Sequence, residues 1–357
     1  MKIVGLITEY NPFHAGHLYH MQQARELTGA DYCVVLMSGS FVQRGEPAIF
    51  DKYLRTKTAL LAGADLVLEI PAAFSTASAH EFAAYGVALL SAIGVDAVVF
   101  GSECGQIEIL KQAAYALNHE SAEFQERLRK GLKAGLTYPQ ARAKALEMED
   151  TWASVLTSPN NILGIEYLRA AEDLHSPMEF YTISRKGSGY HEDTLADANF
   201  PSASAIRGII RNSLSKDKDL LDILASHLPA VTHPAYTGAV PVFVDDFSEL
   251  LNAAVLQMQA TFSIADLSPE LAARLAKPPY FPLSFEERIQ ALKTRQLTYT
   301  RVSRALLHLV LGMREEDISR WKEEGYALYA RILGFRRQSS PLLSCLHKKS
   351  SIPLITK

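Results

Sequence analysis

The sequence predicts an α/β protein built on a parallel, doubly wound sheet. Apolar, β-rich runs alternate with segments of helical periodicity through the first 118 residues, as in consecutive βαβ units. These runs are continuously apolar, which indicates strands covered by helices on both faces. Gly29, Gly63 and Gly94 each close a helical segment, and an Asp begins the next strand two residues later. This pattern is typical of a helix C-cap that runs directly into a strand.

The elements are expected in a regular order. Strands are predicted at 2–8, 31–38, 65–71 and 96–103, and helices at 16–29, 51–63, 79–94 and 106–118. A charged helical stretch follows, which we interpret as an insert at about 119–155. A helix at 158–174 and a strand at 178–186 then complete a nucleotide-binding domain over residues 1–215.

The remaining region, 216–357, is predicted to be helical and basic. Residues 280–357 contain 14 Lys and Arg against 7 Asp and Glu, a local charge of +7, whereas the rest of the chain carries −10. A basic region on an acidic body is expected when that region binds a polyanion such as RNA. Solvated helix faces would give the same count, so charge alone leaves both interpretations open.

Composition excludes several classes of protein. With 357 residues, 48% hydrophobic and 21% charged, the chain is neither disordered nor fibrous. No apolar run approaches the roughly 20 residues that span a bilayer, and no signal peptide is evident, so we expect a cytoplasmic protein with no membrane partner. Cys33, Cys104 and Cys345 stand far apart, which predicts neither disulfides nor a structural zinc site.

The strongest chemical signal is EYNPFHAGH, residues 9–17. In an open parallel sheet the first strand–helix turn is the usual phosphate site, where the N–H groups and positive dipole end of the helix face the ligand. Gly16 would let the backbone pass close to that ligand. His14 and His17 suit stabilisation of the charge that builds on phosphate oxygens during attack at an α-phosphate, so we predict both as catalytic residues.

A Ser- and Arg-containing segment, FPSASAIRGIIRN, is expected to close over the phosphates. It supplies Ser202, Ser204 and Arg207 near a helix start. Such residues are common at any helix start, so the segment gains weight only from its position downstream of the histidine turn.

These motifs resemble the H-x-G-H nucleotidyltransferase superfamily, which shares its nucleotide fold with the class I aminoacyl-tRNA synthetases. Segments spread over the chain are similar to the bacterial tRNA(Met) cytidine acetate ligase family. They are GLITEYNPFHAGHLYH, SGSFVQRGEPA, SPNNILGIEYL, ISRKGSGYH, PSASAIR, TYTRVSRALLHLVLG and SSIPLITK. The resemblance implies activation of acetate with ATP to acetyl-adenylate. It also implies acetyl transfer to the exocyclic amine of the wobble cytidine in elongator tRNA(Met), giving N4-acetylcytidine.

The resemblance and the sheet position together give the expected ATP contacts. They comprise the whole first turn, with Mg²⁺ carried by ATP and no metal held by the protein itself. The turn residues are Ile7, Thr8, Glu9, Tyr10, Asn11, Pro12, Phe13, His14, Ala15, Gly16, His17, Leu18, Tyr19 and His20. Further contacts are predicted at Gly101, Asn160, Asn161, Arg185, Ser204 and Arg207. Asn160 and Asn161 could instead cap the following helix.

The tRNA is predicted to bind the basic helical region. Tyr299, Arg301 and Arg304 lie in a helix whose apolar residues mark a different, buried face, and Arg44 in FVQRGEPA is a further candidate. A core helix with a solvated basic face is the alternative interpretation.

Three other classes of protein fit parts of the sequence. A small-molecule adenylyltransferase would use the same histidine turn, and a pantothenate-synthetase-like carboxylate–amine ligase would use nearly the same chemistry. A non-catalytic RNA-binding module would not need the intact His14, Gly16 and His17. The sequence carries no signal for the oligomeric state, for the residues that read the anticodon or for the selection of acetate over longer acids.

Overall fold

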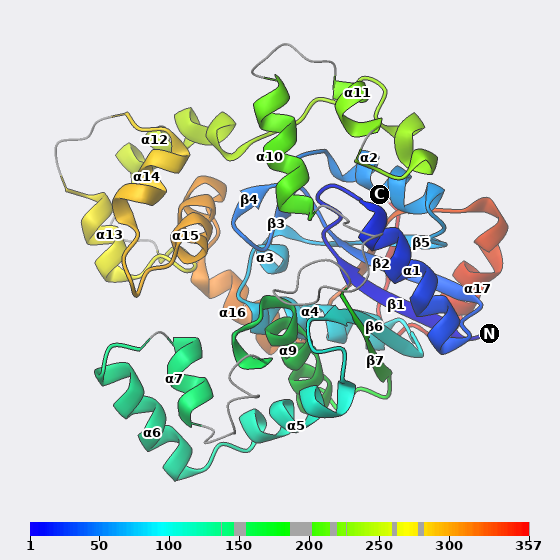
Figure 1. Ribbon diagram of the computed structural model, residues 1–357, viewed down its shortest axis with the longest axis horizontal. Coiled ribbons are helices and arrows are strands. Elements are labelled where there is room, and N and C mark those ends of the chain that lie inside the picture. Colours follow the sequence, from blue (N-terminus) through cyan, green and yellow to red (C-terminus); the bar gives the residue numbers. More distant parts are fainter. Residues whose placement is uncertain are drawn as a thin grey trace, which may run out of the picture.

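The computed structural model describes residues 1–136, 138–145, 155–185, 202–214, 220–225, 227–258, 263–277 and 282–356. Its centre is a seven-stranded sheet in the order β7-β6-β1-β2-β5-β8-β9 (Figure 1). The strands are β1 (Ile3–Thr8), β2 (Tyr32–Ser38), β5 (Leu66–Ile70), β6 (Ala97–Ser102), β7 (Glu179–Ser184), β8 (Ala330–Phe335) and β9 (Leu354–Ile355). The five strands from β7 to β5 run parallel, which confirms the predicted sheet.

Helices cover both faces of the sheet, as the apolar strands predict. Alternate side chains of a strand point to opposite faces, and in β2 the side chains of Val34 and Leu36 join one core while Cys33 and Val35 join the other. The second of these cores lies under α1 (Ala15–Thr28) and α2 (Lys52–Leu61). The first lies under α4 (Ala79–Ala92), α5 (Ile107–Asn118), α9 (Pro159–Asp173) and α17 (Ser340–Lys349).

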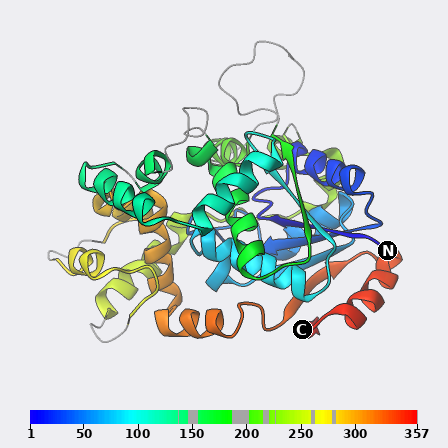
Figure 2. The same ribbon diagram turned by 90° about the horizontal axis from the view of Figure 1, so that it is seen from below.

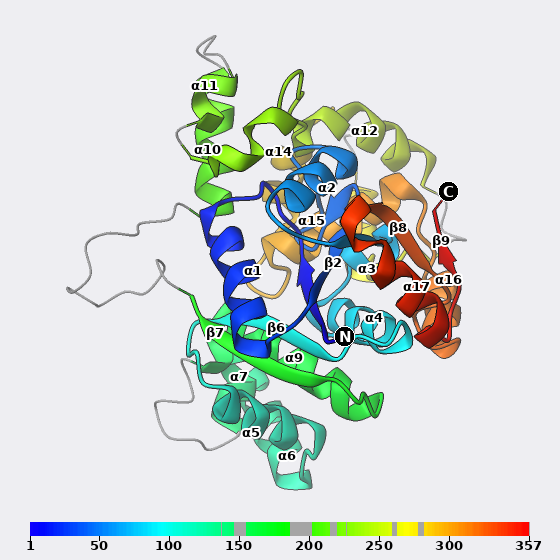
Figure 3. The same ribbon diagram turned by 90° about the vertical axis from the view of Figure 1, so that its right-hand side faces the viewer.

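The charged insert and the middle of the chain are helical. The insert forms α6 (Ala122–Lys133) and α7 (Tyr138–Ala145), which pack on each other on the α5 and α9 side of the molecule (Figures 1 and 3). The chain then continues through α10 (Ala203–Leu214), α11 (Leu220–Ala225), η1 (Ala230–Ala235), η2 (Val244–Phe247), α12 (Ser248–Gln257), α13 (Pro269–Leu275), α14 (Phe285–Leu292), α15 (Tyr299–Leu311) and α16 (Glu315–Glu323). Helices α12 to α15 enclose a hydrophobic core of their own. Figures 1 and 2 place them on one side of the sheet and α17 on the other.

The C-terminal region differs from the predicted all-helical one, because its last part returns to the sheet. Strand β8 pairs antiparallel with β5, and η3 (Arg337–Ser339) leads into α17. The run ARILGF is short and only partly buried. Its partner strand lies far earlier in the chain, so periodicity alone does not identify it.

Three short elements follow the strands at their carboxyl ends. The two-residue strands β3 (Phe41–Val42) and β4 (Glu46–Pro47) form a hairpin after β2, and α3 (Ala72–Ser75) follows β5. Within the described ranges, no helix combines the length and the apolar character needed to cross a membrane.

Candidate active site

His14 and His17 lie at the junction of β1 and α1, at the carboxyl edge of the sheet. His14 is the N-cap of α1, and its Nδ1 accepts a hydrogen bond from the Gly16 backbone N–H at 3.0 Å. Nδ1 of His17 accepts one from the His14 backbone N–H at 3.3 Å, and the two rings stack with centroids 3.8 Å apart. A Cβ at position 16 would lie 2.9 Å from the His14 ring, so this arrangement favours glycine.

Both imidazoles are held in the neutral form. Burial, followed by the charge of Arg185, lowers the pKa of His14 to about 4. Burial also lowers the pKa of His17, with smaller contributions from His14, His20 and Arg185. Because each Nδ1 accepts a backbone hydrogen bond, the single proton of each ring lies on Nε2. The pair therefore offers two N–H donors while carrying no net charge.

Other members of the predicted turn support this pair from the protein interior. Tyr10 and Phe13 are fully buried, with ring centroids 4.9 Å and 5.7 Å from that of His17. His20 lies 3.1 Å from the carbonyl oxygen of Val99 through its Nε2, and burial lowers its pKa to about 4. The side chains of Tyr10 and Phe13 thus pack against His17 from the protein interior.

Arg185 lies at the same carboxyl edge of the sheet, at the end of β7 and next to β6. It directly follows β7, and a Cβ at Gly101 in β6 would lie 3.2 Å from the Arg185 side chain. Nη1 of Arg185 donates to Oδ1 of Asn160 at 3.4 Å. The charge of Arg185 also lowers the pKa of both His14 and His17. The structure therefore brings these five predicted residues to one edge of the sheet.

The Asn161 side chain is buried and hydrogen-bonded within the protein, so its role is structural. It is 2% exposed, and its Oδ1 accepts hydrogen bonds from the backbone N–H groups of Glu103 and Cys104 at 2.9 Å and 3.1 Å. In return the Glu103 carboxylate accepts the backbone N–H groups of Asn160 and Asn161 in the first turn of α9. The asparagine side chains therefore do not cap α9: Glu103 accepts the N–H groups of its first turn, and the Asn161 amide binds the turn after β6. Glu103, which the sequence reasoning missed, fixes α9 to the turn after β6.

Helix α10 brings the Ser and Arg segment onto the histidine turn. Nη1 of Arg207 donates to the backbone carbonyl of Asn11 at 2.8 Å, and its Nη2 donates to Ser204 Oγ at 3.2 Å. Ser202 Oγ accepts from the Ala205 backbone N–H at 3.2 Å at the start of the helix. Two motifs far apart in the sequence thus meet at one place. Residues 186–201, with the rest of ISRKGSGYH, lie outside the described residues.

The predicted tRNA contacts differ in exposure. Arg44 and Arg301 are exposed. The Arg304 side chain is 14% exposed and its Nε donates to Asp266 at 3.1 Å. This largely buried ion pair fits neither a phosphate contact nor the solvated basic face of the alternative interpretation; Arg304 belongs to the packing of the helical region.

The hairpin that carries Arg44 is attached to α15. The carbonyl of Gly45 accepts a hydrogen bond from the buried Ser303 hydroxyl at 2.8 Å. The Tyr299 hydroxyl donates to Glu286 of α14. The hairpin thus joins the nucleotide domain to the helical region at Ser303.

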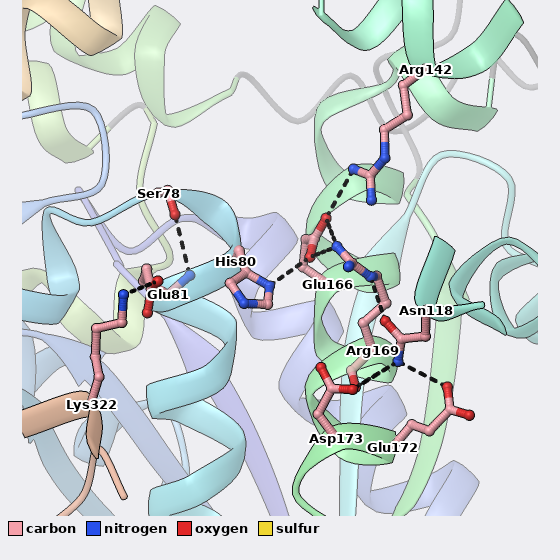
Figure 4. A network of polar contacts seen from close by, with 10 residues as sticks. All are labelled: Ser78, His80, Glu81, Asn118, Arg142, Glu166, Arg169, Glu172, Asp173 and Lys322. Atoms are coloured by element: carbon pink, nitrogen blue, oxygen red, sulfur yellow. Dashed lines mark hydrogen bonds and ion pairs between the residues drawn. The ribbon is translucent and has the colours of Figure 1, made fainter. Parts of the chain in front are cut away.

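A second polar cluster, absent from the sequence reasoning, connects the insert to the sheet domain (Figure 4). The Glu166 carboxylate on α9 accepts hydrogen bonds from Arg169 at 2.8 Å and from Arg142 of α7 at 3.2 Å, and it lies 3.1 Å from His80 Nδ1. Burial alone would raise the pKa of Glu166, but His80 and the two arginines together lower it. One turn of α9 thereby links α9 to α4 and α7.

A cavity of about 430 Å³ lies apart from the histidines, beyond the carboxyl end of β5. Aromatic side chains from α3, α4 and the α16 region line it, among them Phe74, Tyr85, Trp321, Tyr326 and Tyr329. None of the predicted site residues belongs to it. In the part of the chain that the structure describes, no group of three or more His, Cys, Asp or Glu is placed to hold a metal ion.

The doubly wound sheet and the H-x-G-H turn after its first strand define a nucleotide-binding protein of the HIGH type. Residues 1–357 match the family model described as HIGH Nucleotidyl Transferase. Curated relatives narrow this class. The chain is 39% identical over 369 residues to the tRNA(Met) cytidine acetate ligase of Acetivibrio thermocellus, covering 100% of this chain and 88% of that protein. It is 40% identical over 364 residues to that of Clostridium novyi, covering 100% and 90%.

A solved structure agrees with these relatives. The crystal structure of Thermotoga maritima TmcAL bound with alpha-thio ATP shares 34% sequence identity and a TM-score of 0.87 with this chain, covering 100% of it and 86% of that protein. The chain belongs to the tRNA(Met) cytidine acetate ligase family of the HIGH nucleotidyl transferases.

Proposed function

We propose that this chain is a cytoplasmic, ATP-dependent acetate ligase that makes acetyl-adenylate and transfers the acetyl group to the wobble cytidine of elongator tRNA(Met). Its full-length similarity to proteins of that name supports the proposal. The observation that carries the chemistry is the neutral pair His14 and His17, stacked at the N-terminus of α1 near Arg185 and Arg207.

In the first step, a carboxylate oxygen of acetate attacks the α-phosphorus of ATP. The bond from that phosphorus to the bridging oxygen of the β-phosphate breaks, and pyrophosphate leaves with the Mg²⁺ that arrived on the triphosphate. Negative charge grows on the non-bridging α-phosphate oxygens in the transition state. The Nε2–H groups of His14 and His17 and the N-terminus of α1 stabilise this charge, because they are already oriented before it develops.

In the second step, the exocyclic amine of the cytidine attacks the acetyl carbonyl carbon. The bond between that carbon and the phosphate oxygen breaks, AMP leaves with the electron pair, and the amine loses one proton. An acyl phosphate is already activated, so no covalent enzyme intermediate is needed.

The tRNA lies across both parts of the protein under this proposal. ATP binds in the domain formed by residues 1–215. Arg301 on α15 and Arg44 on the attached hairpin face the RNA backbone. A helical core joined directly to the edge of the nucleotide domain supports a macromolecular acceptor. A small-molecule adenylyltransferase or a pantothenate-synthetase-like ligase would not need it.

The test is to incubate the purified protein with ATP, Mg²⁺, radiolabelled acetate and bulk tRNA, and to follow the label. We expect label in tRNA(Met), released as N4-acetylcytidine after nuclease digestion, and none when ATP is omitted or Mg²⁺ is chelated. Label that stays in acetyl-adenylate when tRNA is present would contradict the acceptor. Failure to form acetyl-adenylate would contradict the proposal as a whole.

A further inference from the structure

Arg55, on α2, is a fully buried arginine at the same edge of the sheet as the histidines. Its Nε donates to the carbonyl of Phe50 at 2.9 Å, and its Nη1 donates to those of Glu9 at 2.7 Å and Ser38 at 3.0 Å. Its Nη2 donates to the carbonyl of Gly39. The guanidinium therefore binds the segments that leave β1 and β2 and the one that enters α2.

A charge in this position is unfavourable unless its hydrogen bonds are satisfied. Burial lowers the pKa of Arg55 to about 10, partly offset by Glu9, Asp51 and Glu69. Among the described residues, none of these carboxylates forms an ion pair with Arg55. Backbone carbonyls alone meet its donors, and a planar fork of N–H groups suits several carbonyls at once in a way that a lysine does not.

The carbonyls that Arg55 holds belong to the segments that carry the proposed chemistry. Glu9 begins the turn that ends in His17, and its carboxylate accepts the backbone N–H of Gln43 at 2.9 Å. The Asn11 side chain accepts the backbone N–H of Ile49 at 2.7 Å. The histidine turn and the segment 39–50 are therefore tied to each other directly as well as through the guanidinium.

We propose that Arg55 is a positioning residue for the chemical step, holding the turns after β1 and β2 in the arrangement that aims His14 and His17 at the α-phosphate. The kinetic test of this role rests on the proposed function. Arg55 itself is fully buried, and its donors are bonded to backbone carbonyls. Its effect on the reaction passes through Glu9 and the turn that follows.

Arg25 offers a matched comparison at the opposite, amino-terminal edge of the sheet. It donates to the carbonyls of Asp31 at 3.2 Å and Gly63 at 2.9 Å, and it pairs with Asp65. It thus joins the segments that enter β2 and β5, as Arg55 joins those that leave β1 and β2. A residue that serves only the fold should behave as Arg25 does.

The experiment compares Arg55→Lys with Arg25→Lys in acetate-dependent ATP–pyrophosphate exchange and in thermal unfolding. We expect both variants to unfold at a lower temperature than wild type. Only Arg55→Lys should lose kcat, by about a hundredfold, since small misplacements of catalytic groups have effects of that order. Its KM for ATP should change by less than about threefold. Equal kcat losses in the two variants, or a wild-type kcat in Arg55→Lys, would overturn the proposal.

Hydrogen exchange gives a readout that needs no activity. In the absence of substrates, peptides covering residues 9–17 should exchange faster in Arg55→Lys than in Arg25→Lys, where the effect should fall on residues 63–65. Exchange that is unchanged over 9–17 would count against Arg55 even if the acetate assay failed for the wild type. Arg55→Gln serves as a second, uncharged variant. If neither variant at position 55 folds, Arg55 serves the fold as a whole and the positioning role is rejected.

Discussion

His14 combines two tasks in one ring: Nδ1 caps a helix and Nε2–H is left to donate. Because the cap fixes the ring, the donor direction is set before any ligand binds. The same holds for His17, whose Nδ1 accepts the His14 N–H. Preorganised donors of this kind contribute more than donors that must reorient, since no reorganisation occurs during the reaction.

The first prediction separates the cap from the donor. His14→Asn keeps a side-chain oxygen that can cap α1, whereas His14→Ala loses both functions and about 1 kcal/mol of stability. We expect both variants, and His17→Ala, to form acetyl-adenylate on the order of a hundredfold more slowly than wild type. Pyrophosphate release and thermal unfolding are measured together. Wild-type pyrophosphate release in His14→Ala would exclude the donor role, because alanine, unlike asparagine, carries no side-chain N–H.

The second prediction concerns pH. A histidine with an ordinary pKa of about 6.5 would become charged between pH 7 and 6, but the pKa of His14 is about 4 and that of His17 is also lowered by burial. We therefore expect the rate of adenylate formation at saturating ATP to show no histidine titration between pH 8 and 6. A pH–rate profile with a transition near pH 6.5 that is absent from His14→Asn would contradict the neutral pair.

The same pKa values set the direction of a stability change. The unfolded chain binds protons at its histidines near pH 6.5, while folded His14 and His20 bind them only near pH 4. Stability from these residues is therefore present above pH 6.5 and is lost as pH falls from 6.5 toward 4.

At the scale of elements, the β3–β4 hairpin is the connection between the two functional parts. Its tip carries Arg44 and is bound by Glu9 through the Gln43 N–H, and its Gly45 rests on the backbone of α15. Asn11 of the histidine turn binds the segment after β4 through the Ile49 N–H. A shift of α15 would reach the histidine turn through this hairpin. On the other flank, Lys322 of α16 pairs with Glu81 of α4 at 2.7 Å, and the neighbouring His80 contacts Glu166 (Figure 4).

The third prediction tests this contact with two glycines. Gly45 and Gly312 have φ angles of +79° and +64°, so alanine is strained at both by about 1–2 kcal/mol. A Cβ at Gly45 would also collide with the backbone nitrogen of Arg304 and lie 2.7 Å from the Ser303 carbonyl carbon, whereas nothing lies within 4 Å at Gly312. Gly45→Ala should therefore lower the free energy of unfolding clearly more than Gly312→Ala in urea denaturation. Equal effects would mean that the hairpin can move off α15 freely.

For the whole molecule, the distribution of charge in space differs from its distribution along the chain. The basic stretch 280–357 does not form one surface. Arg337 and Lys348 are exposed on η3 and α17, which pack near Asp65 and Asp96 at the amino ends of the strands, on the edge opposite the histidines. The net local charge of +7 therefore overstates the cations available to RNA near the site.

The fourth prediction compares two pairs of cations. Arg44→Ala with Arg301→Ala should weaken tRNA binding and reduce the slope of log affinity against log salt by roughly 1.4–1.8, because each lost phosphate contact removes about 0.7–0.9. Acetyl-adenylate formation should stay near wild type. Arg337→Ala with Lys348→Ala removes the same charge at the far edge and should leave the salt slope unchanged. If the two double variants bind tRNA alike, the RNA lies elsewhere on the protein.

Local sequence was sufficient for the features that consecutive residues define. Continuous apolar runs determined four of the five parallel strands, and the C-cap glycines determined helix ends such as Gly29, because periodicity and capping act within a few residues. The H-x-G-H spacing likewise located the first turn at the sheet edge, since a turn after β1 has no other place to lie.

Only the tertiary structure decided which polar groups are buried and what pairs with them. Arg304 looked like a surface cation until α15 packed it against Asp266, and Arg55 gave no signal because its four partners are backbone carbonyls. The Asn161 amide and the strand β8 likewise depend on partners far away in the chain. Burial and pairing arise from contacts between segments that are distant in the sequence. Local patterns of residues therefore do not reveal them, and they become visible only in the folded chain.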